Sequence, residues 1–294
     1  MPFDVSHPEI REAVRRALEE DIGPGDVTSE ATIPAGKKAA GGFYARQRLV
    51  LAGIELLPLI YEMRGGVDEL RLEAASGDLC EDGRRVAAVR GEARRLLECE
   101  RVALNFLQRL SGVATLARKY AEAVAGTGVT VLDTRKTTPG LRRLEKMAAA
   151  AGGVTNHRLG LWDAILVKNN HIAAAGGVRA ALERVGGARV PVEIEVRTRE
   201  ELEEALACGA RRLLLDNLTP EEAAEWVRIA HAAGAATELS GGITLENIRA
   251  YAGTGTDYIS CGAITHSATA VDLNFRLEWG SGGGARWRRG GSSV

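Results

Sequence analysis

The sequence predicts an α/β protein with a C-terminal TIM-like α/β barrel of six or seven parallel strands and an N-terminal α+β domain of the open-faced sandwich type. Two observations support this prediction. In the C-terminal half, short apolar runs alternate with helical patterns, and repeated strand-helix units give parallel strands, which at six or seven close more naturally into a barrel than into an open sheet. In the N-terminal half, turn signals separate the short strand candidates instead.

The change between these two patterns sets the expected domain boundaries. We expect the N-terminal domain with a linking helix over residues 1–112, the barrel over 113–278 and a tail over 279–294. The helical pattern of the linking segment covers 92–124, and Ser111-Gly112 predicts a break in it. The tail is rich in Gly, Ser and Arg and offers too little apolar surface to fold, so we expect it to be disordered.

The N-terminal domain begins with an amphipathic helical pattern over residues 6–20, for which Ser6 is the expected N-cap. A stretch with Gly and Pro over residues 21–34 is expected to be a loop. Three strands and one further helix are then expected. The strands lie near 42–45, 70–74 and 85–89, and the helix lies near 54–63.

The expected barrel strands share one feature, which is that polar residues follow each of them. Because the carboxyl ends of barrel strands meet on one face, where the chemistry of such folds takes place, these polar residues describe one pocket. The strands are expected at 129–132, 165–167, 190–196, 213–215, 236–239 and 258–260.

Composition excludes several classes of protein. The net charge of the 294 residues is −1, so no general basic field would attract nucleic acid or anionic lipid, and an anion site must come from local clustering. No run of about 18 apolar residues occurs, and we expect no export signal and no membrane span. The four cysteines are scattered without a C-x-x-C pair, which argues against a zinc site or a disulfide framework and fits a reducing cytoplasm.

Cations cluster directly after strands. Arg135 and Lys136 follow the first barrel strand, His157 and Arg158 lie further on, and Lys168 ends the apolar run before it. If these segments converge on one face, they would hold a ligand with several negative charges.

The last two strands end in small residues that suit a phosphate group. Ser240-Gly241-Gly242 and Gly262 each come after a strand and before a helix, so bare backbone N–H groups can point at an anion. Either turn alone is better explained as a tight turn. As a pair on the two terminal strands, where barrels often bind phosphate, they favour a phosphate site.

Carboxylates end the middle strands. Glu193 and Glu195 share one face of their strand by alternation, and Asp216 ends the next strand. Carboxylates inside a barrel need partners, and a phosphate ligand with two carboxylates suggests Mg²⁺. The alternative is an ion pair with Lys136 or Lys168, which is an equally good explanation for Glu193 and a poorer one for the other two.

Several charged residues are expected to be structural. Arg142, Arg143 and Lys146 are interpreted as solvated residues of a helix face, and His171 as a buried, hydrogen-bonded histidine. His157 is favoured slightly as functional because it lies beside Arg158.

At this point the sequence resembles the quinolinate phosphoribosyltransferase family. Ordered motifs extend from the first helix to about residue 278. The resemblance rests on residues 133–142, 156–158, 161–163, 165–172, 193–196, 215–217 and 240–242, and in the linking helix on 100–101, 105–106 and 111–112.

The family transfers phosphoribose from phosphoribosyl pyrophosphate to quinolinate and releases pyrophosphate and CO₂, which yields nicotinate mononucleotide for NAD synthesis. The resemblance implies a homodimer, in which Arg101 of one chain reaches the pocket of the other, and a Mg²⁺ held by Glu195 and Asp216. The implied quinolinate ligands are Arg135, His157, Arg158 and Lys168. The implied phosphoribosyl pyrophosphate ligands are Lys136, Glu195, Asp216, Ser240, Gly241, Gly242, Gly262 and His266, of which Lys136, Glu195 and Asp216 are the expected catalytic residues.

Three alternatives were weighed against this interpretation. A relative found in molybdate-transport operons shares the fold, and nicotinate phosphoribosyltransferase acts on a monocarboxylate; the set of Arg135, Arg158 and Lys168 favours a dicarboxylate over both. The third alternative, a non-catalytic sensor of a phosphoribosyl ligand, would not require Glu195 and Asp216 together.

Overall fold

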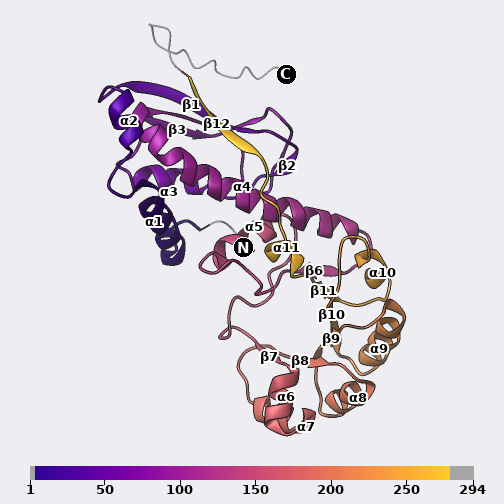
Figure 1. The fold of residues 1–294 in the computed structure, drawn as a ribbon. Coiled ribbons are helices and arrows are strands. Elements are labelled where there is room, and N and C mark those ends of the chain that lie inside the picture. Colours follow the sequence, from indigo (N-terminus) through magenta and orange to yellow (C-terminus); the bar gives the residue numbers. More distant parts are fainter. Residues whose placement is uncertain (1–3, 279–294) are drawn as a thin grey trace. The chain divides into compact units, whose positions relative to one another are not determined.

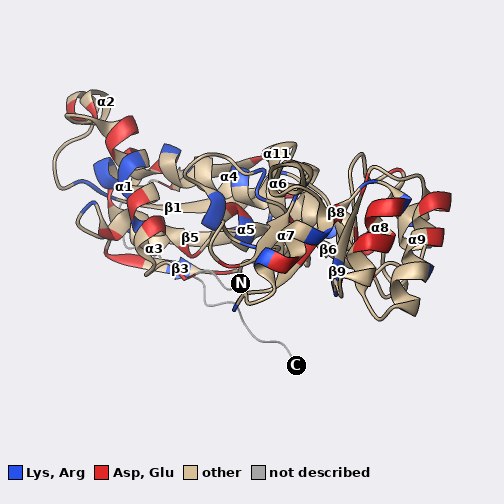
Figure 2. Ribbon diagram, turned by 90° about the horizontal axis from the view of Figure 1, so that it is seen from below, with Lys and Arg blue, Asp and Glu red and all other residues tan. Residues whose placement is uncertain are grey.

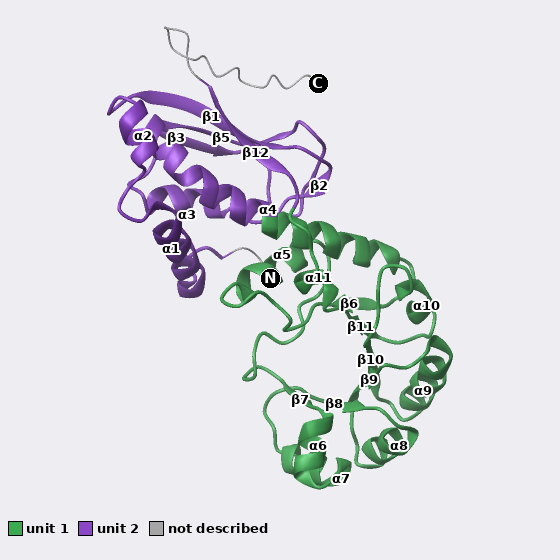
Figure 3. Cartoon of the chain, viewed as in Figure 1, with its two compact units in different colours: residues 1–3, 109–270 green, residues 4–108, 271–294 purple. Residues whose placement is uncertain are grey.

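The computed structural model describes residues 4–278, which form two compact units (Figure 3). Unit 1 consists of Arg109–Ala270, and unit 2 consists of Asp4–Gln108 together with residues 271–278. The boundary falls inside one long helix, α4 (Ala93–Ala123). The predicted disorder of the tail at 279–294 concerns residues outside the described part of the chain.

Unit 2 is an α+β unit, as predicted, built on a four-stranded antiparallel sheet. The strand order is β12-β1-β5-β3, and Figure 1 shows α3 and the first half of α4 along one side of the sheet. The sheet strands are β1 (Lys38–Ala45), β3 (Glu69–Leu72), β5 (Arg85–Glu92) and β12 (Leu273–Glu278). A small second sheet joins β2 (Leu49–Val50) to β4 (Leu79–Cys80), and the remaining helices are α1 (Pro8–Ile22), α2 (Val27–Thr32) and α3 (Leu56–Glu62).

The final strand corrects one predicted boundary. Residues 271–278 were assigned to the barrel, but β12 pairs antiparallel with β1 and so belongs to the sheet of unit 2. Phe275 packs its ring against Phe43, with 4.9 Å between the ring centroids. This pairing joins residues more than 200 positions apart, and no local pattern in the sequence encodes it.

Two further details at the N-terminus differ from the prediction. The expected loop at 21–34 contains α2, because the Asp26 carboxylate accepts hydrogen bonds from the N–H groups of Thr28 (3.1 Å) and Ser29 (3.0 Å) and so caps a short helix. The cap of α1 is His7, whose Nδ1 accepts from the N–H of Glu9 (3.2 Å), rather than the predicted Ser6.

Unit 1 confirms the α/β barrel prediction with six parallel strands. Their order is β6-β11-β10-β9-β8-β7, and Figure 1 shows them following a curve with α8, α9 and α10 on its outer side. The strands are β6 (Thr130–Leu132), β7 (Ile165–Val167), β8 (Val192–Val196), β9 (Arg212–Asp216), β10 (Ala236–Ser240) and β11 (Tyr258–Ser260). The helices are α5 (Arg142–Ala151), α6 (Asn169–Ala175), α7 (Val178–Val185), α8 (Arg199–Ala207), α9 (Pro220–Ala232), α10 (Ile248–Ala252) and α11 (Ala263–His266).

The two ends of this sheet do not pair with each other among the described residues. Leu132 of β6 instead forms an isolated parallel bridge with Thr155, in the segment after α5. The inner strands are apolar and almost fully buried, as in Leu213, Leu215 and Ile259, and each such side chain contributes about 1.5–3 kcal/mol by leaving water. The curved sheet therefore forms a rigid support for the loops at its carboxyl edge.

The linking helix is continuous, so the break predicted at Ser111-Gly112 is wrong. A Cβ atom on Gly112 would lie 2.2 Å from the carbonyl oxygen of Thr269. The glycine therefore serves close packing against the chain after α11, within unit 1, rather than a turn.

Charge on the outer helices is mainly acidic in α8 and α9 (Figure 2). The cations of the pocket described below are thus a local cluster. Within residues 4–278, no helix combines the length and the apolarity that crossing a bilayer requires.

Candidate active site

One pocket of about 640 Å³ lies inside unit 1 at the carboxyl ends of the strands. It is lined by every site residue predicted from the sequence except Arg101, which is exposed on α4 in unit 2. The expected convergence of Arg135, Arg158 and Lys168 on one cavity is therefore observed. Their roles toward a ligand stay predictions.

Asp133 anchors one wall of this pocket. Its side chain, buried directly after β6, accepts hydrogen bonds from the backbone N–H of His157 (2.8 Å) and from Asn156 Nδ2 (2.7 Å). Lys146 of α5 forms an ion pair with Asp133 and donates to the carbonyl oxygen of His157 (2.9 Å). This arrangement fixes the segment that carries His157 and Arg158.

The prediction that Lys146 is solvated is therefore wrong, because its side chain is fully buried. Burial raises the pKa of Asp133 and lowers the pKa of Lys146, and the attraction between the two charges opposes both shifts. Removing one partner would leave the other as an uncompensated buried charge, which costs about 3–5 kcal/mol.

A second buried carboxylate, Glu145, holds the loop between β6 and α5. It accepts hydrogen bonds from the N–H (3.0 Å) and the hydroxyl (2.6 Å) of Thr138, and from two guanidinium nitrogens of Arg109 (2.7 and 3.0 Å). The hydroxyl of Thr265 in α11 donates to the carbonyl oxygen of Lys136 (2.7 Å). The backbone on which Arg135 and Lys136 stand is therefore fixed from two sides.

Arg142 also connects these loops and is not the solvated residue that was expected. Its guanidinium donates to the Thr137 hydroxyl (3.1 Å) and to the carbonyl oxygens of Leu159 (3.3 Å) and Arg135 (3.4 Å). Two nitrogens of one guanidinium thereby join the carbonyl groups of the two segments, which holds Arg135 near Arg158.

Two guanidinium groups face the pocket with donors to spare. Arg158 uses Nη1 on the carbonyl oxygen of Ala164 (3.0 Å), while the buried Nε of Arg135 has no hydrogen-bond partner. Burial, and next the charge of Arg135, lower the pKa of Arg158. An unpaired buried donor beside a second cation is an arrangement that a bound anion would relieve.

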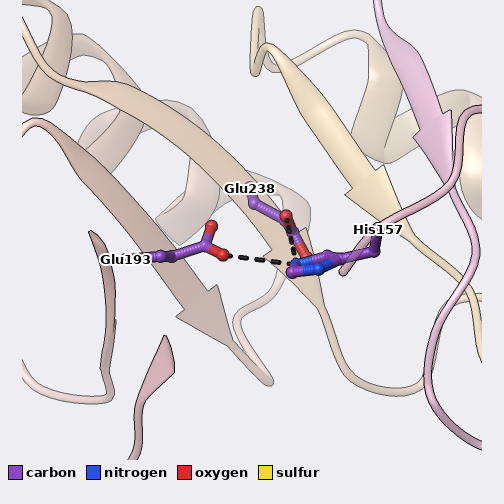
Figure 4. A group of neighbouring side chains, drawn as sticks. All are labelled: His157, Glu193 and Glu238. Atoms are coloured by element: carbon purple, nitrogen blue, oxygen red, sulfur yellow. Dashed lines mark ion pairs between the residues drawn. The ribbon is translucent and has the colours of Figure 1, made fainter. Parts of the chain in front are cut away.

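His157, which lines the pocket, lies between two carboxylates (Figure 4). Its Nε2 is 3.3 Å from an oxygen of Glu193 on β8 and 3.3 Å from an oxygen of Glu238 on β10. Arg212, at the start of β9, reaches Glu193 with Nε (3.1 Å) and Glu238 with Nη2 (3.1 Å). The guanidinium also lies over the ring of Tyr258, 4.4 Å from its centroid.

The two carboxylates control the charge of His157. Burial lowers its pKa, but hydrogen bonds and charges from Glu193 and Glu238 outweigh burial and raise the pKa to about 9. The backbone N–H of Arg158 donates a hydrogen bond to Nδ1 (2.7 Å), and this bond must break before the ring can take a second proton there, so it acts against the rise. Burial likewise acts to raise the pKa of Glu238, while His157 and Arg212 lower it to a net value below normal.

Among residues 4–278, the trio of His157, Glu193 and Glu238 is the group whose ligand atoms lie close enough together for a metal ion. Two cations, the imidazolium and Arg212, already balance its two carboxylates. We therefore interpret the trio as an ion-pair cluster. Neither Arg212 nor Glu238 was predicted as a site residue, although Glu238 lies within a parallel-strand pattern like that of Glu193, which was the available signal.

The carboxylates predicted to bind metal, Glu195 and Asp216, lie at one side of the pocket. Glu195 has Lys168 Nζ at 3.6 Å, so the alternative of an ion pair with Lys168 is present in the structure. Both carboxylates also contact Arg197, which was not among the predicted site residues. Its position two residues after Glu195, hence on the same face of an extended chain, was the available signal.

Glycines at the last two strands bring the backbone to the pocket. Gly241 has φ +93°, and a Cβ there would lie 2.2 Å from Asn217 Oδ1. A Cβ on Gly262 would lie 2.8 Å from Lys136 Cδ. Gly241 therefore requires glycine, whereas a side chain at Gly262 would require the flexible Lys136 side chain to move. Ser240, Gly242 and His266 also line the pocket.

His171 is hydrogen-bonded, as expected, but it is exposed rather than buried. Its Nδ1 accepts a hydrogen bond from the backbone N–H of Lys168 (3.0 Å) at the start of α6. This contact orients the turn from which the Lys168 side chain enters the pocket.

These features define a class, an α/β-barrel protein whose pocket at the strand ends combines free guanidinium donors with glycine turns suited to phosphate. The chain belongs to the quinolinate phosphoribosyl transferase family. Residues 26–111 match the N-terminal domain of that family, and residues 113–276 match its C-terminal domain.

Named relatives match this chain over more than nine tenths of its length. A nicotinate-nucleotide pyrophosphorylase (carboxylating) from Mycobacterium leprae is 41% identical, with 94% of this chain and 100% of the relative covered. A probable enzyme of the same name from Bacillus subtilis is 38% identical, covering 92% and 94%. Among solved structures, the nicotinate-nucleotide pyrophosphorylase from Francisella tularensis has a TM-score of 0.87 at 34% identity (92% and 98% covered), and NadC from Streptococcus pyogenes has 0.88 at 35% (95% and 99% covered).

Proposed function

We propose that this protein is a quinolinate phosphoribosyltransferase, which converts quinolinate and phosphoribosyl pyrophosphate to nicotinate mononucleotide, pyrophosphate and CO₂ in NAD biosynthesis. The observation that carries the proposal is that Arg135, Arg158 and Lys168 line the same pocket as the glycine turns of the last two strands. A dicarboxylate and a phosphorylated sugar would each meet complementary groups there.

The cationic wall suits quinolinate. A planar guanidinium fork binds a carboxylate through two parallel N–H bonds, and Arg135 and Arg158 offer two forks to a flat molecule with two carboxylates. The protonated ring of His157 and the ammonium group of Lys168 add positive charge. The buried Nε of Arg135 would gain the hydrogen bond that it lacks.

The opposite wall suits phosphoribosyl pyrophosphate. Lys136 stands on a backbone fixed by Glu145 and Thr265, so its ammonium group can hold the pyrophosphate without much reorganisation. Ser240-Gly241-Gly242, Gly262 and His266 would bind the remaining phosphate oxygens, largely through backbone N–H groups.

The reaction needs alignment more than a protein nucleophile. The ring nitrogen of quinolinate forms a bond to the anomeric carbon of the ribose while the bond from that carbon to the pyrophosphate oxygen breaks. Positive charge develops on the sugar, where Glu195 and Asp216 would stabilise it, and negative charge develops on the leaving group at Lys136. The carboxylate next to the alkylated nitrogen then leaves as CO₂, its bonding electrons remain on the cationic ring, and a proton takes its place.

Mg²⁺ is part of the proposal. Glu195 and Asp216 line the pocket with oxygen atoms, the ligand type that Mg²⁺ prefers, and Glu195 Oε1 is buried without a hydrogen-bond partner, so they fit such an ion and would hold it. When bound, the ion would neutralise charge on the pyrophosphate.

A homodimer in the cytoplasm completes the proposal. Leu161 and Trp162 are large apolar residues with exposed fractions of 72% and 70%, close in sequence to Arg158, as is usual where a partner binds. Arg101 is exposed on α4 and would serve the pocket of the second chain. The four cysteines are all free thiols, in keeping with a reducing compartment.

The proposal is tested by offering the protein phosphoribosyl pyrophosphate with either quinolinate or nicotinate and measuring pyrophosphate release. We expect release with quinolinate and little with nicotinate, because a monocarboxylate leaves one guanidinium fork unpaired. Equal or faster release with nicotinate would overturn the assignment of the substrate.

A further inference from the structure

Arg197 occupies the two carboxylates that are proposed to bind metal. It follows β8 directly, and its Nη2 donates a hydrogen bond to Asp216 Oδ2 (3.3 Å). The same nitrogen forms an ion pair with Glu195 Oε1 (2.9 Å), a buried oxygen that accepts no hydrogen bond. One guanidinium nitrogen thus bridges the ends of two neighbouring strands. No part of the family resemblance assigned a role to this residue.

The carboxylates are electrically balanced in this arrangement. The other oxygen of Glu195 has Lys168 Nζ at 3.6 Å, and Asp216 Oδ2 accepts a hydrogen bond from Asn217 Nδ2 (2.7 Å). Two negative charges therefore face two positive charges. A divalent cation added to this group alone would give a net charge of +2 in a pocket that already holds Arg135 and Arg158.

The two cations, Arg197 and Lys168, are the exposed members of the group, and Arg197 is the one that contacts both carboxylates. The side chains of Glu195 and Asp216 are 5% and 14% exposed, whereas the side chain of Arg197 is 46% exposed and lines the open pocket. A long side chain of this kind can leave the carboxylates without unpacking the strands. Once displaced, its fork would find partners on phosphate oxygens.

We propose that Arg197 blocks the Glu195–Asp216 pair in the substrate-free protein, so that a divalent cation binds there only together with the diphosphate anion that accepts the displaced guanidinium. The inference rests on the proposed function for the identity of that anion. Metal thereby enters as a complex with the substrate rather than ahead of it.

The test measures Mn²⁺ binding to the substrate-free, full-length protein by the loss of the electron paramagnetic resonance signal of free Mn²⁺. The Arg197→Met variant removes the guanidinium and keeps an unbranched side chain. We expect it to bind one Mn²⁺ per chain at least about tenfold more tightly than the unchanged protein, because a cation competing for the same oxygens is gone. Adding Asp216→Asn to Arg197→Met should abolish the new site.

Arg199→Met is the matched control. Arg199 begins α8 outside the pocket and pairs with Glu203 and Glu225, so this variant makes the same charge change two residues away. Its Mn²⁺ affinity should equal that of the unchanged protein. The inference is overturned if Arg197→Met gains no affinity while its circular dichroism spectrum stays native, or if Arg199→Met gains as much.

This result is separate from the test of the proposed function. Mn²⁺ binding requires neither substrate nor turnover, so a protein that makes nicotinate mononucleotide but shows no effect of Arg197→Met would refute only the blocking role. A protein with the Mn²⁺ effect and no activity would refute only the proposed reaction.

Discussion

Two ion pairs in unit 1 have similar chemistry and different surroundings. In the pair of Asp133 and Lys146 both side chains are 0% exposed, whereas Glu195 is 5% exposed and its partner Arg197 is 46% exposed. The first pair also receives hydrogen bonds from Asn156 and His157. The comparison indicates that an ion pair with both partners buried holds the fold in place. An ion pair with one exposed partner is a contact that a ligand can replace.

The pair of Asp133 and Lys146 should show the largest effect. Lys146→Met leaves Asp133 buried without its counter-ion, so we expect the free energy of unfolding to fall by about 3–5 kcal/mol. Denaturant unfolding measures this loss. Lys119→Met, at an exposed position of α4, should change it by less than about 0.5 kcal/mol. Similar values for the two variants would contradict the role of Lys146.

The cluster around His157 should make stability depend on pH. Its pKa of about 9 lies above the ordinary 6.5, so its contribution is fully present below pH 6.5 and is lost as the pH rises through 9. The change should be on the order of 3 kcal/mol, measured as the difference in unfolding free energy between pH 6 and pH 10. His157→Asn should flatten this part of the profile. An unchanged profile would show that other groups cause the dependence.

The ligand-facing cations should affect binding more than stability. Arg158→Ala removes one fork and should weaken quinolinate binding by about 10- to 100-fold, which corresponds to a charge-assisted hydrogen bond of about 1.5–3 kcal/mol. Isothermal titration calorimetry measures this change, and the affinity for phosphoribosyl pyrophosphate should persist. Arg179→Ala, at an exposed position of α7, is the control. Unaltered quinolinate affinity in Arg158→Ala would refute the assigned contact.

The smallest effect is expected in a test of whether each active site uses residues from both chains of a dimer. Arg101→Ala and Lys136→Ala proteins should each be inactive alone, but after mixing and reassociation about one quarter of full activity should return, since half of the random dimers contain one intact site of two. The measurement is the rate of nicotinate mononucleotide formation. No recovery would mean that each chain builds its pocket alone.

Local patterns carried most of the fold and much of the site. Strand-helix alternation predicted all six strands of unit 1, and the polar residues after them predicted which side chains line the pocket. In both cases a pattern among residues close in the sequence is enough to predict the structural feature.

What the sequence missed depends on contacts between distant residues. Lys146 and Arg142 read as a polar helix face, and only the position of α5 against β6 and the His157 segment shows that both are tied into the fold. Arg212 on β9 bridges Glu193 on β8 and Glu238 on β10. These three strands are adjacent in the sheet but far apart in the sequence, so residue spacing does not predict the bridge. The pairing of β12 with β1 was missed for the same reason.

The central claim is that one pocket of unit 1 joins quinolinate to phosphoribose and then releases its carboxylate. The most direct measurement supplies quinolinate labelled in the carboxylate next to the ring nitrogen and follows labelled CO₂ and nicotinate mononucleotide together. We expect equal amounts of both, only when phosphoribosyl pyrophosphate is present, and neither with Lys136→Ala. Absence of nicotinate mononucleotide, or CO₂ release that continues without the sugar substrate, would contradict the account.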